Sequence, residues 1–209
     1  MISILQIPLP FVSLILASSS PFRKELLNKL GLDFDVVSPD IDESRKVNET
    51  PEQLVFRLAQ EKAFEVAKTR SGFIIASDQV ATLGDKILTK PHSHENAVKQ
   101  LEKSSGNTVT FLTSLALLDT HTDTIDTVVE KSKIVFKVLS AKQIEYYLQK
   151  EKPYNCAGSF KSEALGISLV ECIEDSDPNT LIGLPLIQLI KMLENQGIDV
   201  LSQSTDLKD

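Results

Sequence analysis

The stretch from Phe73 to Val80 holds residue types that are well suited to catalysis. Its first four residues, Phe73-Ile74-Ile75-Ala76, are apolar or small and predict a short strand that is buried on both faces. Asp78 follows and is expected at the carboxyl end of that strand, where open α/β sheets place their active sites. An aspartate there can instead cap a turn. The choice depends on which other polar residues the fold brings to it.

The start of a predicted helix offers a candidate anion-binding group. Ser18-Ser19-Ser20-Pro21 signals a helix start, with serines as caps and a proline suited to the first helical position. The hydroxyl of Ser20 and the guanidinium of Arg23 are three residues apart around the first turn, so they can converge with its free N–H groups. A capping serine beside a solvated arginine is the alternative.

Two lysines are further candidates for contact with an anion. Val55, Ala59, Lys62 and Val66 share one stripe of a predicted helix. Lys62 therefore either projects into a cleft or extends its ammonium to the surface. Lys90 precedes a proline, which holds it in an extended conformation.

The loop of residues 38–43 carries three carboxylates, from Asp40, Asp42 and Glu43. Acidic loops are usually solvated. Such a loop gains a role in catalysis if another carboxylate and a phosphate meet it around a divalent cation.

Size and charge limit the classes of function. The 209 residues are enough to bury a core, in one domain or in two lobes that share a cleft. The net charge of −7 argues against a nucleic-acid binder, because such domains neutralise phosphates with a basic surface. A small anion needs only a locally basic cleft. The apolar stretch Ile2–Ala17 lacks a basic start and contains Pro8 and Pro10, so we expect neither a signal peptide nor a membrane span.

Cysteine and histidine give no metal motif. Cys156 and Cys172 lack metal-ligand spacing, and we interpret them as two buried thiols in a reducing cytoplasm. The three histidines are not spaced as zinc ligands either.

The hydrophobic pattern alternates between strands and helices and predicts a mixed α/β fold. Strands are expected at residues 12–17, 34–37, 73–76, 108–118, 124–138 and 167–173, with a hairpin at 80–89 around Gly84-Asp85. Helices are expected at residues 21–30, 51–69, 94–103, 140–150 and 181–195. Residues 152–166 are expected to form a loop. We expect an extension at residues 1–10, a single domain of two lobes at 11–201 and a frayed tail at 202–209.

Five short motifs keep a common order and spacing between residue 13 and about residue 197. They are Leu16-Ala17-Ser18-Ser19-Ser20-Pro21-Phe22-Arg23, Asp42-Glu43, Gln60-Glu61-Lys62-Ala63, Ser77-Asp78-Gln79-Val80 and Lys90-Pro91. Together they resemble the signature of the Maf nucleotide pyrophosphatases. Residues 156–163 (CAGSFKSE) and 177–187 (DPNTLIGLPLI) are similar to the 7-methyl-GTP pyrophosphatase branch, whereas the dTTP/UTP branch has a different central loop.

This resemblance implies a fold and an activity. The fold would be α/β of the Maf/inosine-triphosphatase-like kind, with a mixed twisted sheet and two lobes flanking a central cleft. The activity would convert a nucleoside triphosphate and water to a monophosphate and pyrophosphate, with magnesium or manganese as the divalent metal. Such an enzyme would remove modified nucleotides in the cytoplasm, often as a homodimer, and would bind neither nucleic acid nor membranes.

The resemblance also assigns roles position by position. Asp78 matches the proposed proton acceptor, and Glu43 with Asp78 matches the metal contacts. The phosphate-contacting positions are Ser20, Arg23, Lys62 and Lys90. The positions associated with substrate choice are Phe22, Gln79 and Glu163.

Two residues depart from the expected pattern. Position 22 is phenylalanine where tryptophan is expected, which weakens base stacking. Thr89 stands where glycine commonly precedes the Lys-Pro motif, and it stiffens the loop that presents Lys90. The first ten residues have no counterpart in the family.

The same three specificity residues suit a methylated guanine on chemical grounds. Guanine methylated at N7 carries a positive ring charge, which the face of Phe22 and the carboxylate of Glu163 would attract. Gln79 can donate to and accept from the base edge. The alternative is that Phe22 packs in the core and Glu163 is solvated.

Other functions stay open at this point. The same chemistry could act on dTTP and UTP or on other modified nucleotides. A non-catalytic nucleotide-binding regulator of septum formation is an alternative of a different class.

Overall fold

The computed structural model describes residues 13–202. Its strands are β1 (Leu14–Ala17), β2 (Asp35–Val37), β3 (Phe73–Leu83), β4 (Lys86–Leu88), β5 (Thr108–Asp119), β6 (Thr124–Phe136) and β7 (Val170–Glu174). Its helices are α1 (Pro21–Asn28), α2 (Pro51–Ala67), α3 (His94–Ser104), α4 (Ala141–Glu151), α5 (Pro178–Ile182) and α6 (Leu186–Asn195), with short 3₁₀ segments η1 (Ala157–Ser159) and η2 (Leu165–Leu169). The predicted extension at 1–10 and residues 203–209 of the predicted tail lie outside the described residues.

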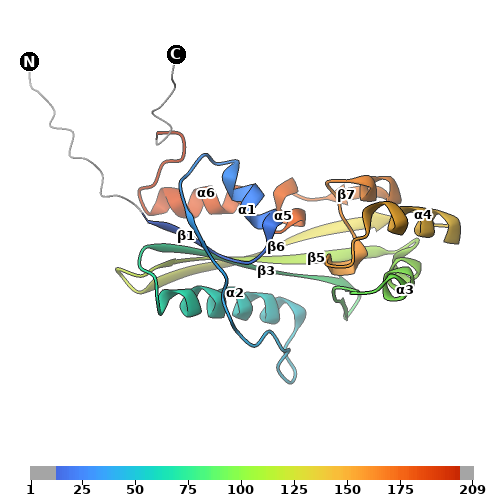
Figure 1. Cartoon of the computed structure of the whole chain (residues 1–209), viewed down its shortest axis with the longest axis horizontal. Coiled ribbons are helices and arrows are strands. Elements are labelled where there is room, and N and C mark those ends of the chain that lie inside the picture. The colour runs from blue at the N-terminus through green and yellow to red at the C-terminus, as the bar shows by residue number, and fades with distance from the viewer. Residues whose placement is uncertain (1–12, 203–209) are drawn as a thin grey trace, which may run out of the picture.

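In this part of the chain the strands form one mixed sheet. Its order is β2-β1-β3-β5-β6-β7, with β4 paired to β3. β1 pairs in parallel with β2 and β3, and the remaining pairs are antiparallel. Figure 1 shows α1, α5 and α6 on one face of this sheet and α2 on the other, with α3 and α4 near its far end. The predicted mixed α/β class is therefore confirmed.

The apolar residues form cores at two ends of the sheet. At one end, α1 and α6 pack on one face of β1, β3 and β5, and α2 packs on the opposite face. At the other end, α3, α4 and Phe160 pack against the far halves of β5 and β6. β3 joins the two ends of the sheet. Its residues Ile74 and Ile75 belong to the cores that contain α2, α1 and α6, and its residue Ala81 belongs to the core that contains α3 and α4. Polar residues are unusual in the middle of a buried strand. In β3, the three consecutive polar residues Ser77, Asp78 and Gln79 lie between the cores at the two ends of the sheet.

The predicted position of Asp78 at a strand end is wrong. β3 runs for 11 residues, and Asp78 lies near its middle, paired with Ser114 of β5. β3 continues because β5 and β4 still pair with it after its parallel neighbour has ended. β1 stops at Ala17, opposite Ala76, so Asp78 lies just past the carboxyl end of β1.

Two predicted elements near the C-terminus also need correction. The helix expected at 181–195 is two helices, α5 and α6, because Gly183 has a φ of 128° and Pro185 lacks the N–H that a continuous helix needs there. The strand expected at 167–173 begins only at Val170, since Leu165–Leu169 forms η2. The predicted hairpin at Gly84-Asp85 and the long antiparallel pair β5–β6 are confirmed.

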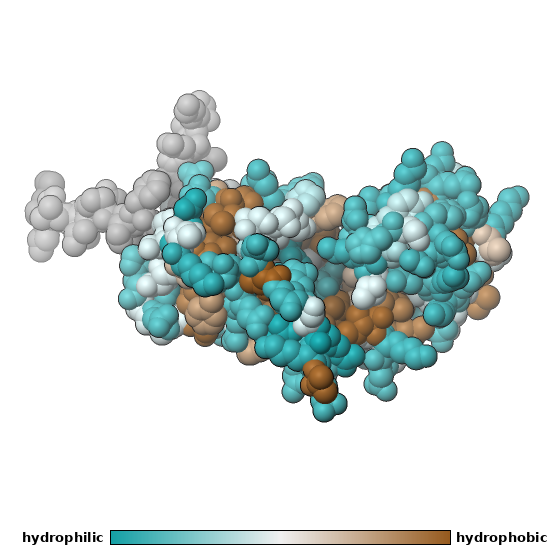
Figure 2. Space-filling model, turned by 60° about the horizontal axis from the view of Figure 1, so that its bottom comes forward, coloured by the Kyte–Doolittle hydropathy of each residue, from teal (hydrophilic) through white to brown (hydrophobic). Residues whose placement is uncertain are grey.

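The surface is mostly polar. Figure 2 shows hydrophilic residues over much of one face, with apolar residues in separate patches among them. Cys156 and Cys172 are both free thiols, but Cys172 is exposed and Cys156 is half-buried, so their predicted burial is wrong. Among the described helices, none has the length and apolar character needed to cross a bilayer.

Candidate functional site

The centre of the candidate site is the ammonium of Lys62, which contacts two carboxylates. Lys62 Nζ lies 2.6 Å from Asp78 Oδ1 and 2.7 Å from Glu43 Oε1. The Lys62 and Asp78 side chains are only 7% and 11% exposed, whereas the Glu43 side chain is 59% exposed. One cation thus joins a buried strand carboxylate to a carboxylate on a surface loop.

Helix α2 delivers Lys62 to this point. Thr50 and Gln53 form a reciprocal capping box and Pro51 occupies the first turn, so the start of the helix is well defined. The stripe predicted from the sequence is buried, including Lys62. The ammonium therefore faces Asp78, and the alternative in which it extends to the surface is wrong.

The backbone of β3 fixes Asp78. Its N–H donates to Ser114 Oγ over 3.0 Å, and that hydroxyl donates back to the Asp78 carbonyl over 3.2 Å. Asp78 is thus a strand residue, and the hypothesis that it caps a turn is wrong. Replacing a buried ion pair by apolar residues is often neutral or stabilising, so stability alone does not account for this pair.

Arg23 is the second cation of the site. It projects from α1, and its Nε donates to the carbonyl of Gly183 over 2.9 Å while Nη1 lies 3.5 Å from Ser18 Oγ. Burial lowers the pKa of Arg23, and the charges of Asp78 and Glu43 act in the opposite direction. Arg23 is half-buried and lies within electrostatic range of both carboxylates, so the alternative of a fully solvated arginine is wrong.

The junction between α5 and α6 holds two site elements through one carbonyl. The Gly183 oxygen accepts from Arg23 and also from Ser77 Oγ, at 2.8 Å. The backbone of Gly183 has a φ of 128°, a conformation that residues with a side chain rarely adopt. No side-chain pattern in the sequence predicts this contact, because the acceptor is a backbone atom.

Lys90 is exposed and contributes through its charge. Burial acts to raise the pKa of Glu43, but the hydrogen bond and charge of Lys62 and the charges of Lys90 and Arg23 outweigh it and leave that pKa below its usual value. Three cations therefore act on Glu43, and two of them, Lys62 and Arg23, also act on Asp78. This excess of positive charge suits a polyanionic ligand.

Ser20 has a capping role in this structure. Its hydroxyl accepts from the N–H of Arg23 over 3.4 Å and so caps α1. It stands one residue before the helix, beside Ser18, whose hydroxyl accepts from the Ser20 N–H over 3.1 Å. The predicted phosphate contact of Ser20 stays a prediction.

Gln79 is held by the strand and by the end of α5. Its Nε2 lies 2.8 Å from Thr113 Oγ1 and 3.1 Å from each of the carbonyls of Thr180 and Leu181. Because these acceptors engage the amide nitrogen, the Gln79 carbonyl oxygen is the atom better placed to meet a base. Its predicted role in base reading stays a prediction.

The other two specificity positions lie on α1 and in the turn between η1 and η2. Phe22 is half-buried in the first turn of α1. Glu163 is exposed, and its carboxylate accepts from the neighbouring Ser162 hydroxyl over 3.4 Å. Glu163 and Lys90 both act electrostatically on Cys156, which places them in one neighbourhood. Their roles in base selection also stay predictions.

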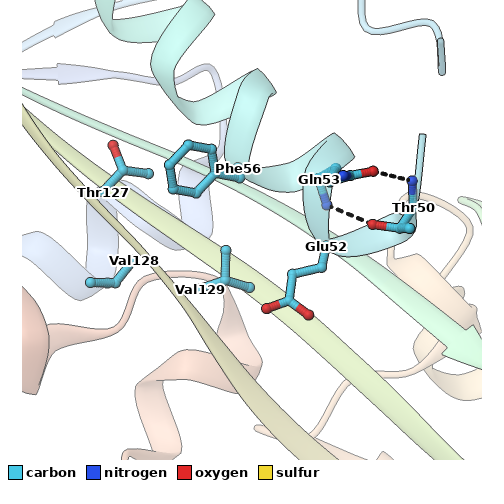
Figure 3. A pocket seen from close by; sticks show the side chains of 7 residues that line it. All are labelled: Thr50, Glu52, Gln53, Phe56, Thr127, Val128 and Val129. Carbon is cyan, nitrogen blue, oxygen red and sulfur yellow. Dashed lines mark hydrogen bonds between the residues drawn. The ribbon is translucent and has the colours of Figure 1, made fainter.

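A groove of about 460 Å³ lies on another part of α2. It is lined by Thr50, Glu52, Gln53, Phe56, Thr127, Val128 and Val129. Figure 3 shows the Phe56 ring and the Glu52 carboxylate beside β6, with the capping box at its rim. Its charged lining residue is an acid, so this groove does not suit a triphosphate. A smaller groove of about 240 Å³ includes Lys90, Lys99 and Lys103 in its lining.

The carboxylates fit a divalent cation that is held jointly with substrate phosphates. Glu43 and Asp78 both reach the same nitrogen, so they can approach one cation. In residues 13–202 no group of three or more Asp, Glu, His and Cys side chains converges as a metal site. Magnesium is commonly bound by one or two carboxylates with water and phosphates, and two carboxylates meet that requirement.

Comparisons with known proteins identify relatives of this chain. A family model described as "Maf-like protein" matches residues 13–196. A protein of Aliivibrio fischeri named 7-methyl-GTP pyrophosphatase is 53% identical over 189 residues, which cover 90% of this chain and 98% of that protein. A protein of Nitrosococcus oceani with the same name is 52% identical over 190 residues, covering 90% and 96%.

Among solved structures, the likeness is more distant. The Ham1 protein of Staphylococcus aureus aligns with a TM-score of 0.42 at 16% identity, over 60% of this chain and 71% of that one. A Mycobacterium abscessus structure titled nucleoside-triphosphatase / dITP/XTP pyrophosphatase aligns with a TM-score of 0.40 at 14% identity, over 61% and 76%.

Proposed function

The chain belongs to the Maf-like protein family, and we propose that it hydrolyses 7-methyl-GTP to 7-methyl-GMP and pyrophosphate. The observation that carries the proposal is the meeting of Lys62 with Asp78 and Glu43, with the charge of Arg23 acting on both carboxylates and the charge of Lys90 acting on Glu43. The substrate is proposed from the names of relatives that are about half identical over nine-tenths of the chain.

The cations would bind the triphosphate and stabilise its leaving group. Negative charge builds on pyrophosphate as the phosphoanhydride bond breaks, and fixed cations favour that transition state. Arg23 is held by the Gly183 carbonyl and Lys62 by its two carboxylates, so both are oriented before substrate binds. Such preorganisation avoids the cost of ordering these side chains during the reaction.

Asp78 is the residue proposed to accept the proton of the attacking water. Its carboxylate is largely buried but retains some exposure, and its backbone is fixed by Ser114. A metal bound by Asp78 and Glu43 would supply a more acidic water and neutralise phosphate charge. Asp78 then has two candidate roles, as general base and as metal ligand.

Selection of the base would depend on the residues around the phosphate site. The face of Phe22 and the charge of Glu163 suit the cationic ring of 7-methylguanine. The carbonyl oxygen of Gln79 would accept a hydrogen bond from the base edge, because its amide nitrogen is engaged by Thr113 and by the end of α5.

A pyrophosphate-release screen tests the proposal. The full chain is incubated with 7-methyl-GTP, GTP, dTTP, UTP and other modified nucleotides, each with magnesium, with manganese and with chelator. We expect metal-dependent release that is fastest with 7-methyl-GTP. Faster release from dTTP or UTP would reassign the substrate. No release from any nucleotide would contradict the enzymatic function and favour a nucleotide-binding regulator.

Assembly and location stay predictions. A homodimer is tested by light scattering on the eluted peak of a size-exclusion column, and a monomer would contradict it. A cytoplasmic location is supported by the two free thiols, because thiols persist in a reducing compartment.

A further inference from the structure

We propose that Arg57 and Glu49 are positioning residues that hold the loop of residues 44–49 against α2 so that Glu43 meets Lys62. Neither residue was a candidate from the sequence. The proposal rests on the proposed function, because that function gives Glu43 its task in binding the metal.

The contact between Arg57 and Glu49 is bidentate and well shielded from solvent. Arg57 Nε lies 2.6 Å from Glu49 Oε1, and Nη2 lies 2.9 Å from Glu49 Oε2. The two side chains are 15% and 8% exposed. This fork geometry is the strong form of an arginine–carboxylate pair. The hydrogen bonds from Arg57 lower the pKa of Glu49 to about 2, so the pair stays ionised at neutral pH.

The same pair also forms hydrogen bonds with the backbone of the loop. Arg57 Nη2 donates to the carbonyl of Ser44 over 3.0 Å, and Glu49 Oε2 accepts from the N–H of Lys46 over 3.0 Å. Arg45 Nε donates to the Glu49 carbonyl over 2.6 Å. Two residues of the loop are therefore tied to the ion pair and a third to the backbone of Glu49, and the first of them, Ser44, directly follows Glu43.

Glu43 needs this support because its own surroundings are open. It lies in a segment without helix or strand, and its side chain is 59% exposed. Holding an exposed glutamate in one position costs side-chain entropy. Lys62 and Arg57 both project from α2, so the helix that presents the ammonium also fixes the loop that presents the carboxylate. α2 thus sets both partners of the Lys62–Glu43 contact.

The first test follows the loop itself and does not depend on turnover. Arg57→Gln and Glu49→Gln are compared with Arg57→Lys, which keeps the charge but loses the fork. Lys68→Gln, which removes an exposed pair with Glu65 at the end of α2, is the matched control. Amide hydrogen exchange at Lys46, whose N–H donates to Glu49 Oε2, is expected to be faster in the first two variants, less so in Arg57→Lys, and unchanged in Lys68→Gln. Unchanged exchange in both glutamine variants of well-folded protein would overturn the proposal.

The second test asks whether the pair acts through Glu43. The manganese concentration that gives half-maximal hydrolysis of 7-methyl-GTP is measured with Arg57→Gln in the native chain and in the Glu43→Gln background. Loss of a residue that supports a metal ligand typically weakens metal affinity about 10- to 100-fold. We expect a rise of about tenfold in the native chain and little further rise without Glu43, because the carboxylate to be positioned is then gone.

The outcomes separate the two proposals. An equal rise in both backgrounds would show that Arg57 acts generally on the fold and would overturn its positioning role. If the native chain hydrolyses no nucleotide, the proposed function fails, while the exchange experiment still decides whether Arg57 and Glu49 hold the loop.

Discussion

Helix α2 lines two regions that differ in chemistry. Lys62 lies with Asp78 and Glu43 in a charged site, and Arg57 pairs with Glu49 of the neighbouring loop. The first turns of the same helix border the groove of about 460 Å³ beside β6, where Phe56 and two valines supply the apolar lining. One helix thus serves a charged centre with one part of its surface and an open apolar groove with another.

The difference shows that volume alone does not identify a site that suits a polyanion. A triphosphate needs several oriented cations, and the charges of Lys62, Arg23 and Lys90 all act on Glu43 beside Asp78. In the groove, the carboxylate of Glu52 pairs with Lys131 at 2.7 Å, with both side chains about half exposed. Charge placed among buried groups acts through a lower dielectric than charge in open solvent, so the charged site is the stronger electrostatic environment.

The largest effect is expected from Asp78→Asn, which keeps the shape of the side chain and removes its charge. Turnover of 7-methyl-GTP should fall about 100- to 10,000-fold, the usual contribution of a general base. Pyrophosphate release measures the rate, and a thermal melt checks that the fold is kept. Near-native turnover in a folded variant would show that the charge of Asp78 is not needed for catalysis. The charged centre would then have no better claim to be the active site than the groove.

The sequence predicted the members of this centre better than their arrangement. The period of α2 placed Lys62 on the buried stripe, and the family motifs linked it to Asp78 and Glu43. The position of Asp78 within β3 was missed, because a strand that ends and a strand that continues with polar residues look alike until its neighbours β4 and β5 are known.

Other contacts could not be predicted because their signals are not local. The Gly183 carbonyl meets Arg23 across 160 positions of sequence, and a backbone acceptor leaves no side-chain pattern. Arg57 and Glu49 are close in sequence, but a helix arginine near a glutamate is usually a solvated pair. The burial of this pair and its hydrogen bonds to the loop depend on tertiary packing.

A smaller effect is expected from Gly183→Ala, which tests how far the charged centre depends on its supports. The φ of 128° is unfavourable for alanine, so strain of about 1–3 kcal/mol should lower the melting temperature. A shift of the carbonyl would move Arg23, and misplacement of this kind can lower turnover by up to about 100-fold.

Gly197→Ala is the matched control for this variant, because Gly197 also has a positive φ, of 77°, but follows α6 away from Arg23. It should lower stability without a comparable loss of turnover. Equal losses of turnover in the two variants would show that the Gly183 carbonyl has no special link to the site.

Glu163→Gln should have a moderate effect that concerns selectivity. Unit charges 4 Å apart interact by about 1 kcal/mol in water, so loss of this exposed carboxylate should narrow the preference for 7-methyl-GTP over GTP about fivefold. The ratio of kcat/KM for the two nucleotides measures it. The same loss for both substrates would remove Glu163 from base selection.

The smallest effect is expected in the groove, from Glu52→Gln. Its pair with Lys131 is about half exposed, and such pairs contribute about 0–1 kcal/mol, so the melting temperature should change little. Turnover and the metal requirement should stay at native values, since Glu52 lines the groove while Asp78 and Glu43 meet Lys62 elsewhere. A tenfold loss of turnover would instead place substrate in the groove, because a surface pair of this strength has no other route to an effect that large.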